Sequence, residues 1–490
     1  MTPTRLALTT LAALTLAACA KRAPSTSAPY DGPSGDKSYS TAESSADGGG
    51  YAPAAPSGAS AVAGADYSEA ADEGDWGAPE MEASEPAPSE EAFAMTDSDS
   101  APVAVSSGRA SRRAKRRAKR AKASSYDQRI QAGTLTAGTF DDTLNWGTFS
   151  SFMANMTQNP SVAVVAERFT GPMTTIVVTD AAGRPLPAAS VELRAGQRDG
   201  RPLVTGTDGR AFAISGYDHG AGQLQVRAAG GAWTKVRPGS SVNLRTHANA
   251  APIRALDVAL VIDATGSMSD ELEYLKVEVR SIVKEIKQEF PNVDQRFSVV
   301  VYRDQGDDYV TQHFSFSPEL RQFEHWLGQQ SADGGGDYPE AMDAALEITA
   351  DLPWRTGADT ARVAFLIADA PPHDQSMAPT MTAVEDLRSA GVAIYPVAAS
   401  GVASEAEVVM RTSALMTGGQ YLWLTDDSGV GNSHAEPHIP CYSVEALREA
   451  MTRMVLSELA GKRVEANPKR AVRNVGQSNA GVCAPLRMAR

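Results

Sequence analysis

The sequence predicts an α/β protein whose largest domain is a doubly wound, mostly parallel sheet. A small all-β sandwich and a long disordered N-terminal tether precede that domain. Residues 19–125 are rich in Ala, Ser, Gly, Pro and charge, and residues 172–247 hold short alternating strands separated by turn residues. From residue 254 onward, near-continuous Val, Ile and Leu runs alternate with amphipathic stretches. That alternation is typical of parallel strands covered by helices on both faces.

Residues 1–18 are predicted to be an export signal. Arg5 precedes an apolar stretch from Leu6 to Ala18 that is too short to span a membrane. The following "LAAC", ending at Cys19, resembles the bacterial lipobox, which implies cleavage before Cys19 and lipidation of its thiol. Ala20 then implies the outer membrane, with the chain facing either the periplasm or the outside. The alternative is an ordinary secretory signal.

The predicted tether, residues 19–125, cannot bury enough apolar surface to offset its chain entropy. Residues 66–99 hold twelve acidic side chains and no Lys or Arg, whereas residues 109–122 hold nine basic side chains and no acid. The basic run could bind anionic lipid or lipopolysaccharide head groups, or fold back on the acidic run. The alternative is a solvated linker. An exported chain with a net charge of −14 is not expected to bind nucleic acid.

Two smaller folded parts are predicted after the tether. Residues 126–171 regain aromatic and apolar side chains and form a short connecting segment, in which Asp141 and Asp142 are either ligands or turn residues. Residues 172–247 alternate like a β-sandwich. Their "VVTDAAGRPLPAASVELR" resembles bacterial immunoglobulin-like and carboxypeptidase-regulatory-like domains. A spacer or platform role is expected, with a carbohydrate-binding face as the alternative.

Polar side chains follow two of the predicted parallel strands. "ALDVALVID" ends in Asp263 and is followed by Thr265 and Ser267, and "RVAFLIAD" ends in Asp369. Because ligands of doubly wound sheets bind at the carboxyl ends of the strands, we expect these side chains to meet. Two carboxylates and two hydroxyls suit Mg²⁺, with Mn²⁺ or Ca²⁺ as alternatives. The hydroxyls could also cap the following helix.

The motif "DATGS" followed by a later strand-end Asp resembles the metal-ion-dependent adhesion site of von Willebrand factor A (VWA) domains. The resemblance covers residues 254–461 and implies metal-dependent capture of a protein partner. The family's D-x-S-x-S has Thr265 in place of its first Ser, which keeps the hydroxyl. Its middle-loop Thr is replaced by "GGGDYPEA". We predict that Asp337 approaches the metal directly or through water. The alternative is a loop carboxylate ahead of a helix start at Pro339.

No nucleophile and base pair can be assigned, so the chain is predicted to be a non-enzymatic, lipid-anchored binding protein. Two alternatives stay open: a metal-independent structural or assembly factor of the cell envelope, and a hydrolase. His373 and Asp374 follow Asp369 and could face the same crevice. The "HAEPH" segment, His434 to His438, is expected to be a surface loop because Pro437 prevents the helix that a metallopeptidase motif needs.

Cys441 and Cys483 are the two cysteines that remain after Cys19. Disulfides persist in exported proteins, so we expect them to pair. The bridge would tie the C-terminal tail, residues 462–490, to the last domain and contribute roughly 3 to 4 kcal/mol. The alternative is two unpaired thiols.

Overall fold

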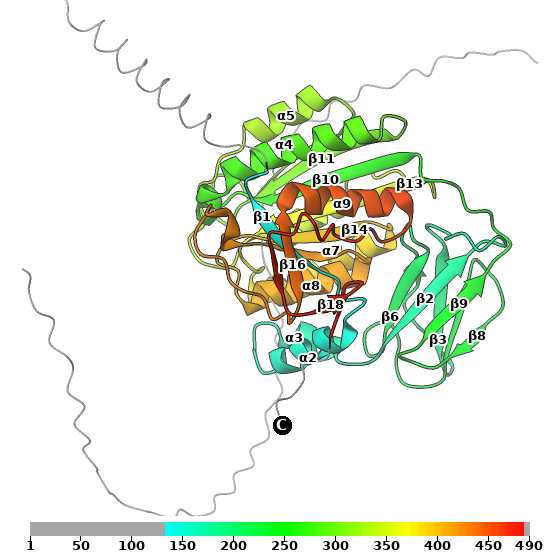
Figure 1. Ribbon diagram of the computed structural model, residues 1–490. Coiled ribbons are helices and arrows are strands. Elements are labelled where there is room, and N and C mark those ends of the chain that lie inside the picture. Colours follow the sequence, from blue (N-terminus) through cyan, green and yellow to red (C-terminus); the bar gives the residue numbers. More distant parts are fainter. Residues whose placement is uncertain (1–132, 485–490) are drawn as a thin grey trace, which may run out of the picture. The chain divides into compact units, whose positions relative to one another are not determined.

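The computed structural model describes residues 133–484 (Figure 1). The predicted export signal 1–18, the predicted lipidation site Cys19 and the predicted tether 19–125 lie outside the described residues. The acidic run 66–99 and the basic run 109–122 belong to that tether.

A nine-stranded sheet lies at the centre, with the strand order β12-β11-β10-β13-β14-β15-β1-β16-β17. The five strands from β11 to β15 in this order are parallel to one another, and β12, β1, β16 and β17 run antiparallel to their neighbours. The predicted doubly wound, mostly parallel sheet is therefore confirmed. Its strands are β1 (Thr136–Phe140), β10 (Ala255–Asp263), β11 (Asp294–Tyr302), β12 (Thr311–Ser317), β13 (Thr360–Ala368), β14 (Ala393–Ala398), β15 (Tyr421–Leu424), β16 (Tyr442–Ala446) and β17 (Arg473–Val475).

Helices cover both faces of this sheet (Figure 1). One face packs against α4 (Leu272–Glu289), α5 (Leu320–Gly328) and α9 (Leu447–Ala460), and the other against α6 (Met342–Ala350), α7 (Met377–Ser389) and α8 (Ser404–Thr417). Strand β10 shows why its sequence is apolar throughout. All nine of its residues are buried, and successive side chains enter opposite cores, with Leu260 in one and Val261 in the other.

The β-sandwich consists of two facing sheets, β6-β2-β9 and β4-β3-β7-β8, with β5 paired to β3. Alternate residues of β3 and β7 face a separate core that includes Val191 and Val226. Arg388 of α7 donates to the carboxylate of Asp218 at 2.7 Å and to the carbonyl of Phe212, which joins the sandwich to the central sheet's helices. The strands are β2 (Met173–Thr179), β3 (Ser190–Ala195), β4 (Arg198–Asp199), β5 (Leu203–Val204), β6 (Arg210–Ile214), β7 (Leu224–Ala228), β8 (Thr234–Val236) and β9 (Ser241–Arg245).

The described part of the predicted connecting segment, residues 133–171, belongs to the α/β unit. Its strand β1 lies between β15 and β16, and α2 (Trp146–Met156) and α3 (Ala163–Ala166) follow it. The β-sandwich is therefore inserted between β1 and the rest of the central sheet. Periodicity does not show this, because β1 has only five residues. Its Gly138 lies under the indole of Trp423, where any Cβ would collide with the ring.

Asp142 explains how this segment is held. The Arg411 guanidinium, fully buried in α8, donates to both oxygens of Asp142 at 2.6 and 3.0 Å and to Glu407 at 2.8 Å. Asp142 is thus a structural ion-pair partner. Asp141 accepts hydrogen bonds from Thr143 in a turn and from the Arg463 guanidinium at 3.1 Å. Sequence reasoning had offered ligand or turn roles for both.

The C-terminal segment returns to the sheet. β17 pairs with β16, and Cys441 forms a disulfide with Cys483, whose Cα atoms are 5.6 Å apart. The short strands β18 (Ser478–Asn479) and β19 (Val482–Cys483) form a separate hairpin. Asn145 contacts this hairpin by donating to the carbonyl of Gly481 and accepting from the amide of Cys483.

Across residues 133–484, none of the helices combines the length and the apolar character that crossing a bilayer requires.

Removal of Asp142 should destabilise the whole α/β unit. Asp142→Ala leaves Arg411 buried with one carboxylate fewer, so we expect the free energy of unfolding to fall by about 3 kcal/mol. Urea unfolding followed by circular dichroism measures this. Asp199→Ala, which removes an exposed ion pair with Arg194, is the matched control and should cost less than about 1 kcal/mol. Equal effects of the two substitutions would refute a buried structural role for Asp142.

Candidate functional site

Two carboxylates meet at the carboxyl edge of the central sheet. Asp263 is the last residue of β10, and Asp369 directly follows β13. These strands are parallel neighbours, with Ile262 paired to Ile367, so both carboxylates lie at the same edge. Asp263 is fully buried, and Asp369 is 4% exposed. Burial and the neighbouring charge of Asp369 hold the pKa of Asp263 well above its usual range.

The hydroxyls of the first motif surround the same carboxylate. Thr265 donates to Asp263 Oδ1 through its hydroxyl at 2.7 Å and its amide at 3.0 Å, and Ser267 Oγ lies 3.1 Å from Thr265 Oγ1. The 3₁₀ helix Gly266–Asp270 and α4 begin without a side-chain capping hydrogen bond. These hydroxyls therefore organise the loop around Asp263. Its second oxygen, Oδ2, is buried without a hydrogen bond of normal geometry. The Tyr302 hydroxyl approaches this carboxylate and acts to lower its pKa, against the larger effects of burial and Asp369.

The structure places Asp337 and Glu340 differently. Asp337 is exposed, whereas Glu340, three residues later, is 2% exposed and has a buried Oε2 without a hydrogen bond. Burial, followed by the charges of Asp263 and Asp304, raises the pKa of Glu340 to about 9. Glu340 is thus a site residue that sequence reasoning missed, and a metal role for Asp337 stays a prediction.

The backbone of the glycine-rich segment, residues 332–340, determines that Glu340 rather than Asp337 is buried. Helix α6 begins at Met342, later than the expected start at Pro339, and Glu340 forms a bridge with Pro372 in the loop after β13. The Glu340 amide donates to the Pro371 carbonyl at 3.0 Å. This backbone pairing fixes Glu340 beside the Asp369 loop and leaves the preceding residues on the surface.

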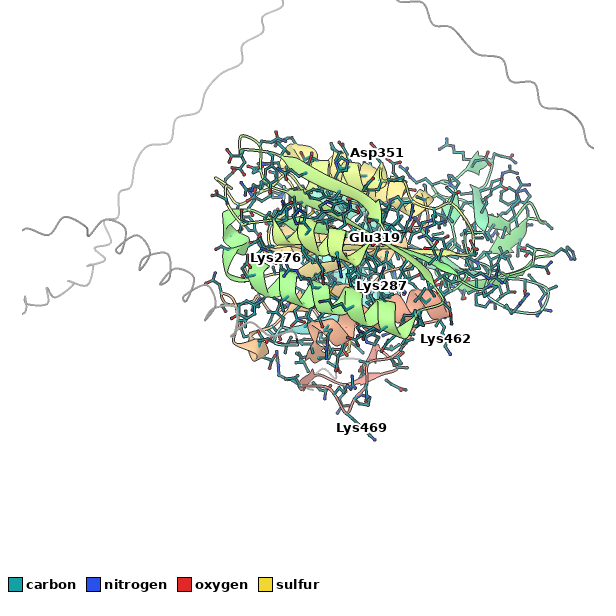
Figure 2. The ribbon with its side chains drawn as sticks, turned by 90° about the horizontal axis from the view of Figure 1, so that it is seen from above. Lys276, Lys287, Glu319, Asp351, Lys462 and Lys469 are labelled. Atoms are coloured by element: carbon teal, nitrogen blue, oxygen red, sulfur yellow. A yellow bond between two sulfur atoms is a disulfide. The ribbon has the colours of Figure 1, made fainter. Side chains whose placement is uncertain are left out.

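The glycines of "ADGGGDY" let this segment lie directly on the metal-motif loop. Gly266 donates to the Gly334 carbonyl at 3.0 Å. A Cβ on Gly335, whose φ is +74°, would meet Glu340 Oε1 at 3.0 Å and Thr265 Cβ at 3.3 Å. The positive φ favours glycine at this position, and an added Cβ would also crowd its two neighbours. Lys276 of α4, labelled in Figure 2, donates to the Gln330 carbonyl at 2.8 Å and holds the start of the segment.

Tyr338 fastens the other end of the segment. Its hydroxyl donates toward the carbonyls of Asp369 and Gly401 at 3.3 and 3.2 Å and accepts from the amide of Ala403 at 2.8 Å. Its side chain is nevertheless 42% exposed. The loops after β13 and β14 are therefore joined to the glycine-rich segment through one hydroxyl.

The histidines take separate positions. His373 Nε2 lies 2.7 Å from Asp304 Oδ1, and Asp304 also faces Glu340, so His373 borders the crevice. Asp374 instead accepts from the Ser161 hydroxyl. The expectation of a surface loop at "HAEPH" is wrong for His434, which is 8% exposed, because Glu271 and Asp426 bind its two ring nitrogens.

The part of the chain that the structure describes contains no metal site made of acidic and imidazole side chains alone. No group of three or more His, Cys, Asp or Glu side chains there is arranged to hold a metal ion. A site at Asp263 would therefore need hydroxyl or water oxygens among its ligands.

Comparison with protein families matches residues 257–418 to the von Willebrand factor A domain. This part of the chain is a VWA domain. The matched range includes Asp263, Thr265, Ser267, Glu340 and Asp369. VWA domains commonly mediate protein–protein interaction and often bind a divalent metal ion.

Two curated relatives share short stretches with this chain. A putative ariadne-like RING finger protein, R811, of Acanthamoeba polyphaga mimivirus is 32% identical over 123 residues. The alpha-protein kinase vwkA of Dictyostelium discoideum is 28% identical over 121 residues. These stretches are 25% and 24% of this chain but only 12% and 19% of the relatives' lengths.

Two solved structures show a low overall similarity. BatB from Bacteroides thetaiotaomicron is 13% identical, with a TM-score of 0.29, over 42% of this chain and 98% of that chain. Proximal thread matrix protein 1 from the mussel byssus is 19% identical, with a TM-score of 0.26, over 32% of this chain and 40% of that chain.

Neutralising Glu340 should stabilise the chain in EDTA. The pKa of Glu340 rises from its ordinary 4.5 to about 9 on folding, so its contribution to stability is lost as the pH rises from 4.5 to 9. Glu340→Gln escapes that loss. We expect its free energy of unfolding to equal the wild type's near pH 4.5 and to exceed it by about 1 to 3 kcal/mol near pH 8.

Urea unfolding at several pH values measures this difference. Asp337→Asn is the matched control, because its side chain is exposed and should change stability by less than about 0.5 kcal/mol at every pH. A Glu340→Gln variant that is less stable than the wild type near pH 8 would show that the carboxylate is satisfied without a cation.

Proposed function

We propose that this chain is a non-enzymatic binding protein whose VWA domain captures a protein partner through a divalent cation. One observation carries the proposal: the buried carboxylate of Asp263 lies near those of Asp369 and Glu340, and the neighbouring Tyr302 hydroxyl brings it no positive charge. Burying like charges together is costly unless they are protonated or face a cation. A bound cation offsets that repulsion.

The proposed ligands are the carboxylates of Asp263 and Asp369 and the hydroxyls of Thr265 and Ser267. Glu340 faces the cation directly or through water, and Asp337 on the exposed side of the segment is a weaker candidate. All of these are hard oxygen donors, which suit Mg²⁺, with Mn²⁺ and Ca²⁺ as alternatives. Once bound, the cation supplies positive charge at an edge of the sheet that is otherwise strongly negative.

The exposed Ser267 marks the side of the motif from which a partner can approach. Within the described residues no three acidic side chains are arranged as direct ligands, so Glu340 acts on the ion through its nearby charge. A third negative charge near a divalent ion neutralises it more fully than two do, so an acidic group of a partner would be held less tightly. A neutral oxygen of the partner is therefore the preferred ligand. The proposed cation thus binds a protein surface by coordinating one of its oxygens, and no covalent bond is broken.

The proposal also places the protein in the cell envelope. The "LAAC" motif supports lipidation of Cys19 and anchoring to the outer membrane, facing either the periplasm or the outside. The positive charge of the basic run 109–122 supports its contact with anionic head groups of the membrane.

Calorimetric titration of Mg²⁺, Mn²⁺ and Ca²⁺ into the full chain tests the cation site. We expect one saturable site in the wild type and no binding to Asp263→Ala, because that substitution removes the buried oxygen. Asp337→Asn should change the affinity by less than about threefold, whereas Glu340→Gln should weaken it by about tenfold, since a full charge is lost from a buried site.

Absence of heat with all three ions would contradict the cation site and favour the metal-independent assembly factor. Binding that survives Asp263→Ala would place the ion elsewhere. Turnover of a generic phosphoester by the metal-loaded chain, lost in the same variant, would contradict the non-enzymatic assignment and favour the hydrolase.

Replacing the lipidated residue tests the location. Cys19→Ser should move the protein from the membrane fraction to the soluble fraction of the envelope, because no acyl chain can then be attached. Cell fractionation with immunodetection measures this, and Cys441→Ser together with Cys483→Ser is the control that keeps the anchor. A Cys19→Ser protein that stays in the outer-membrane fraction would contradict lipid anchoring through this residue.

A further inference from the structure

The loop between β15 and β16 is folded against the start of α4. It begins with the 3₁₀ helix Asp426–Ser428 and ends at Cys441, which the disulfide to Cys483 holds in place. His434 lies in the middle of this loop, and its side chain is only 2% exposed. A histidine buried so completely in a loop requires partners for both ring nitrogens.

Both partners of His434 are carboxylates. Nε2 lies 2.8 Å from Oε1 of Glu271, and Nδ1 lies 2.8 Å from Oδ1 of Asp426. A carboxylate oxygen only accepts, and a neutral imidazole carries a single N–H. Only the doubly protonated, positively charged ring can therefore donate to both carboxylates at once.

The burial of the Glu271 carboxylate makes its contact with His434 energetically important. Its side chain is completely buried, and His434 is the cationic side chain that contacts it. The Ser400 amide donates weakly to the other oxygen at 3.4 Å. Gly431, with φ +82°, lies so close to this carboxylate that any Cβ would collide with it. When His434 loses its proton, a buried carboxylate loses its countercharge, which is costly in a low-dielectric interior.

We propose that His434 is an acid-stabilised latch, which holds the loop 426–440 against Glu271 at low pH and releases it as the pH rises. Glu271 lies directly between the 3₁₀ helix Gly266–Asp270 and α4, so the latch adjoins the metal-motif loop. Release is limited at one end by the disulfide at Cys441. The latch is independent of whether the site binds a cation.

The direction of the pH dependence follows from the surroundings of His434. Burial lowers the pKa of His434, but its hydrogen bonds to Glu271 and Asp426 outweigh burial and raise that pKa above the ordinary 6.5. These two carboxylates, from the segment before α4 and from the 3₁₀ helix after β15, are the charged groups that face the ring within residues 133–484. The stabilisation is complete below pH 6.5 and is lost as the pH rises through the folded-state pKa.

His438 provides a matched control in the same loop. Its Nδ1 lies 2.7 Å from Glu407 Oε2, and its side chain is 55% exposed. Because one carboxylate needs only one N–H, the neutral ring keeps this hydrogen bond. Glu407 also retains Arg411 as a cationic partner.

Hydrogen–deuterium exchange of the full chain at about pH 5.5 and pH 8.5, corrected for intrinsic exchange rates, tests the latch. In the wild type, peptides within residues 426–440 should lose about tenfold in protection at the higher pH, while peptides from β10 and β13 keep theirs. His434→Gln should abolish the difference, and His438→Gln should preserve it. Glu271→Gln should leave the loop protected at both pH values, because a neutral pair needs no countercharge.

Unchanged protection of the wild-type loop between the two pH values would overturn the proposal. A His434→Gln chain that keeps the wild-type difference would overturn it as well. Protection of β10 in each variant shows that the chain is folded, and Glu271→Gln provides a second reading if His434→Gln does not fold.

Discussion

The repulsion between buried carboxylates at one edge of the central sheet is the constraint on which the rest of the site depends. Adjacent parallel strands force Asp263 and Asp369 to the same edge, and the bridge to Pro372 adds Glu340. The glycine-rich segment then lies across the motif, and Tyr338 fastens it to the neighbouring loops. These contacts hold together acids that would separate in water, which is how folds build cation sites.

The central sheet that positions these acids contains strands that come before and after the inserted β-sandwich in the sequence. β1 completes the sheet between β15 and β16, and the buried pair of Asp142 and Arg411 joins its following turn to α8. The disulfide and the hairpin near Cys483 close the same end. Because β1 and β10 belong to one sheet, the chain enters the inserted sandwich from that sheet and returns to it.

Much of this arrangement follows from sequence periodicity. Long apolar runs predicted β10 and β13, and strand ends in a parallel sheet predicted where Asp263 and Asp369 would meet. Periodicity did not predict the short strand β1, nor which acidic side chain of the glycine-rich loop is buried. β1 has five residues and a central glycine, and nothing in "GGGDYPEA" states whether Asp337 or Glu340 turns inward. His434 was unexpected because its partner Glu271 is distant in the sequence.

A crystal grown with Mn²⁺, a substitute for Mg²⁺ with detectable anomalous scattering, would show whether these acids hold a cation. We expect one anomalous peak at about 2.0 to 2.3 Å from oxygens of Asp263 and Asp369, with the hydroxyls of Thr265 and Ser267 around it. Glu340 should lie against the ion or one water away. Well-ordered side chains at this edge without a peak at millimolar Mn²⁺ would rule out the cation site and make these carboxylates a protonated, metal-free cluster.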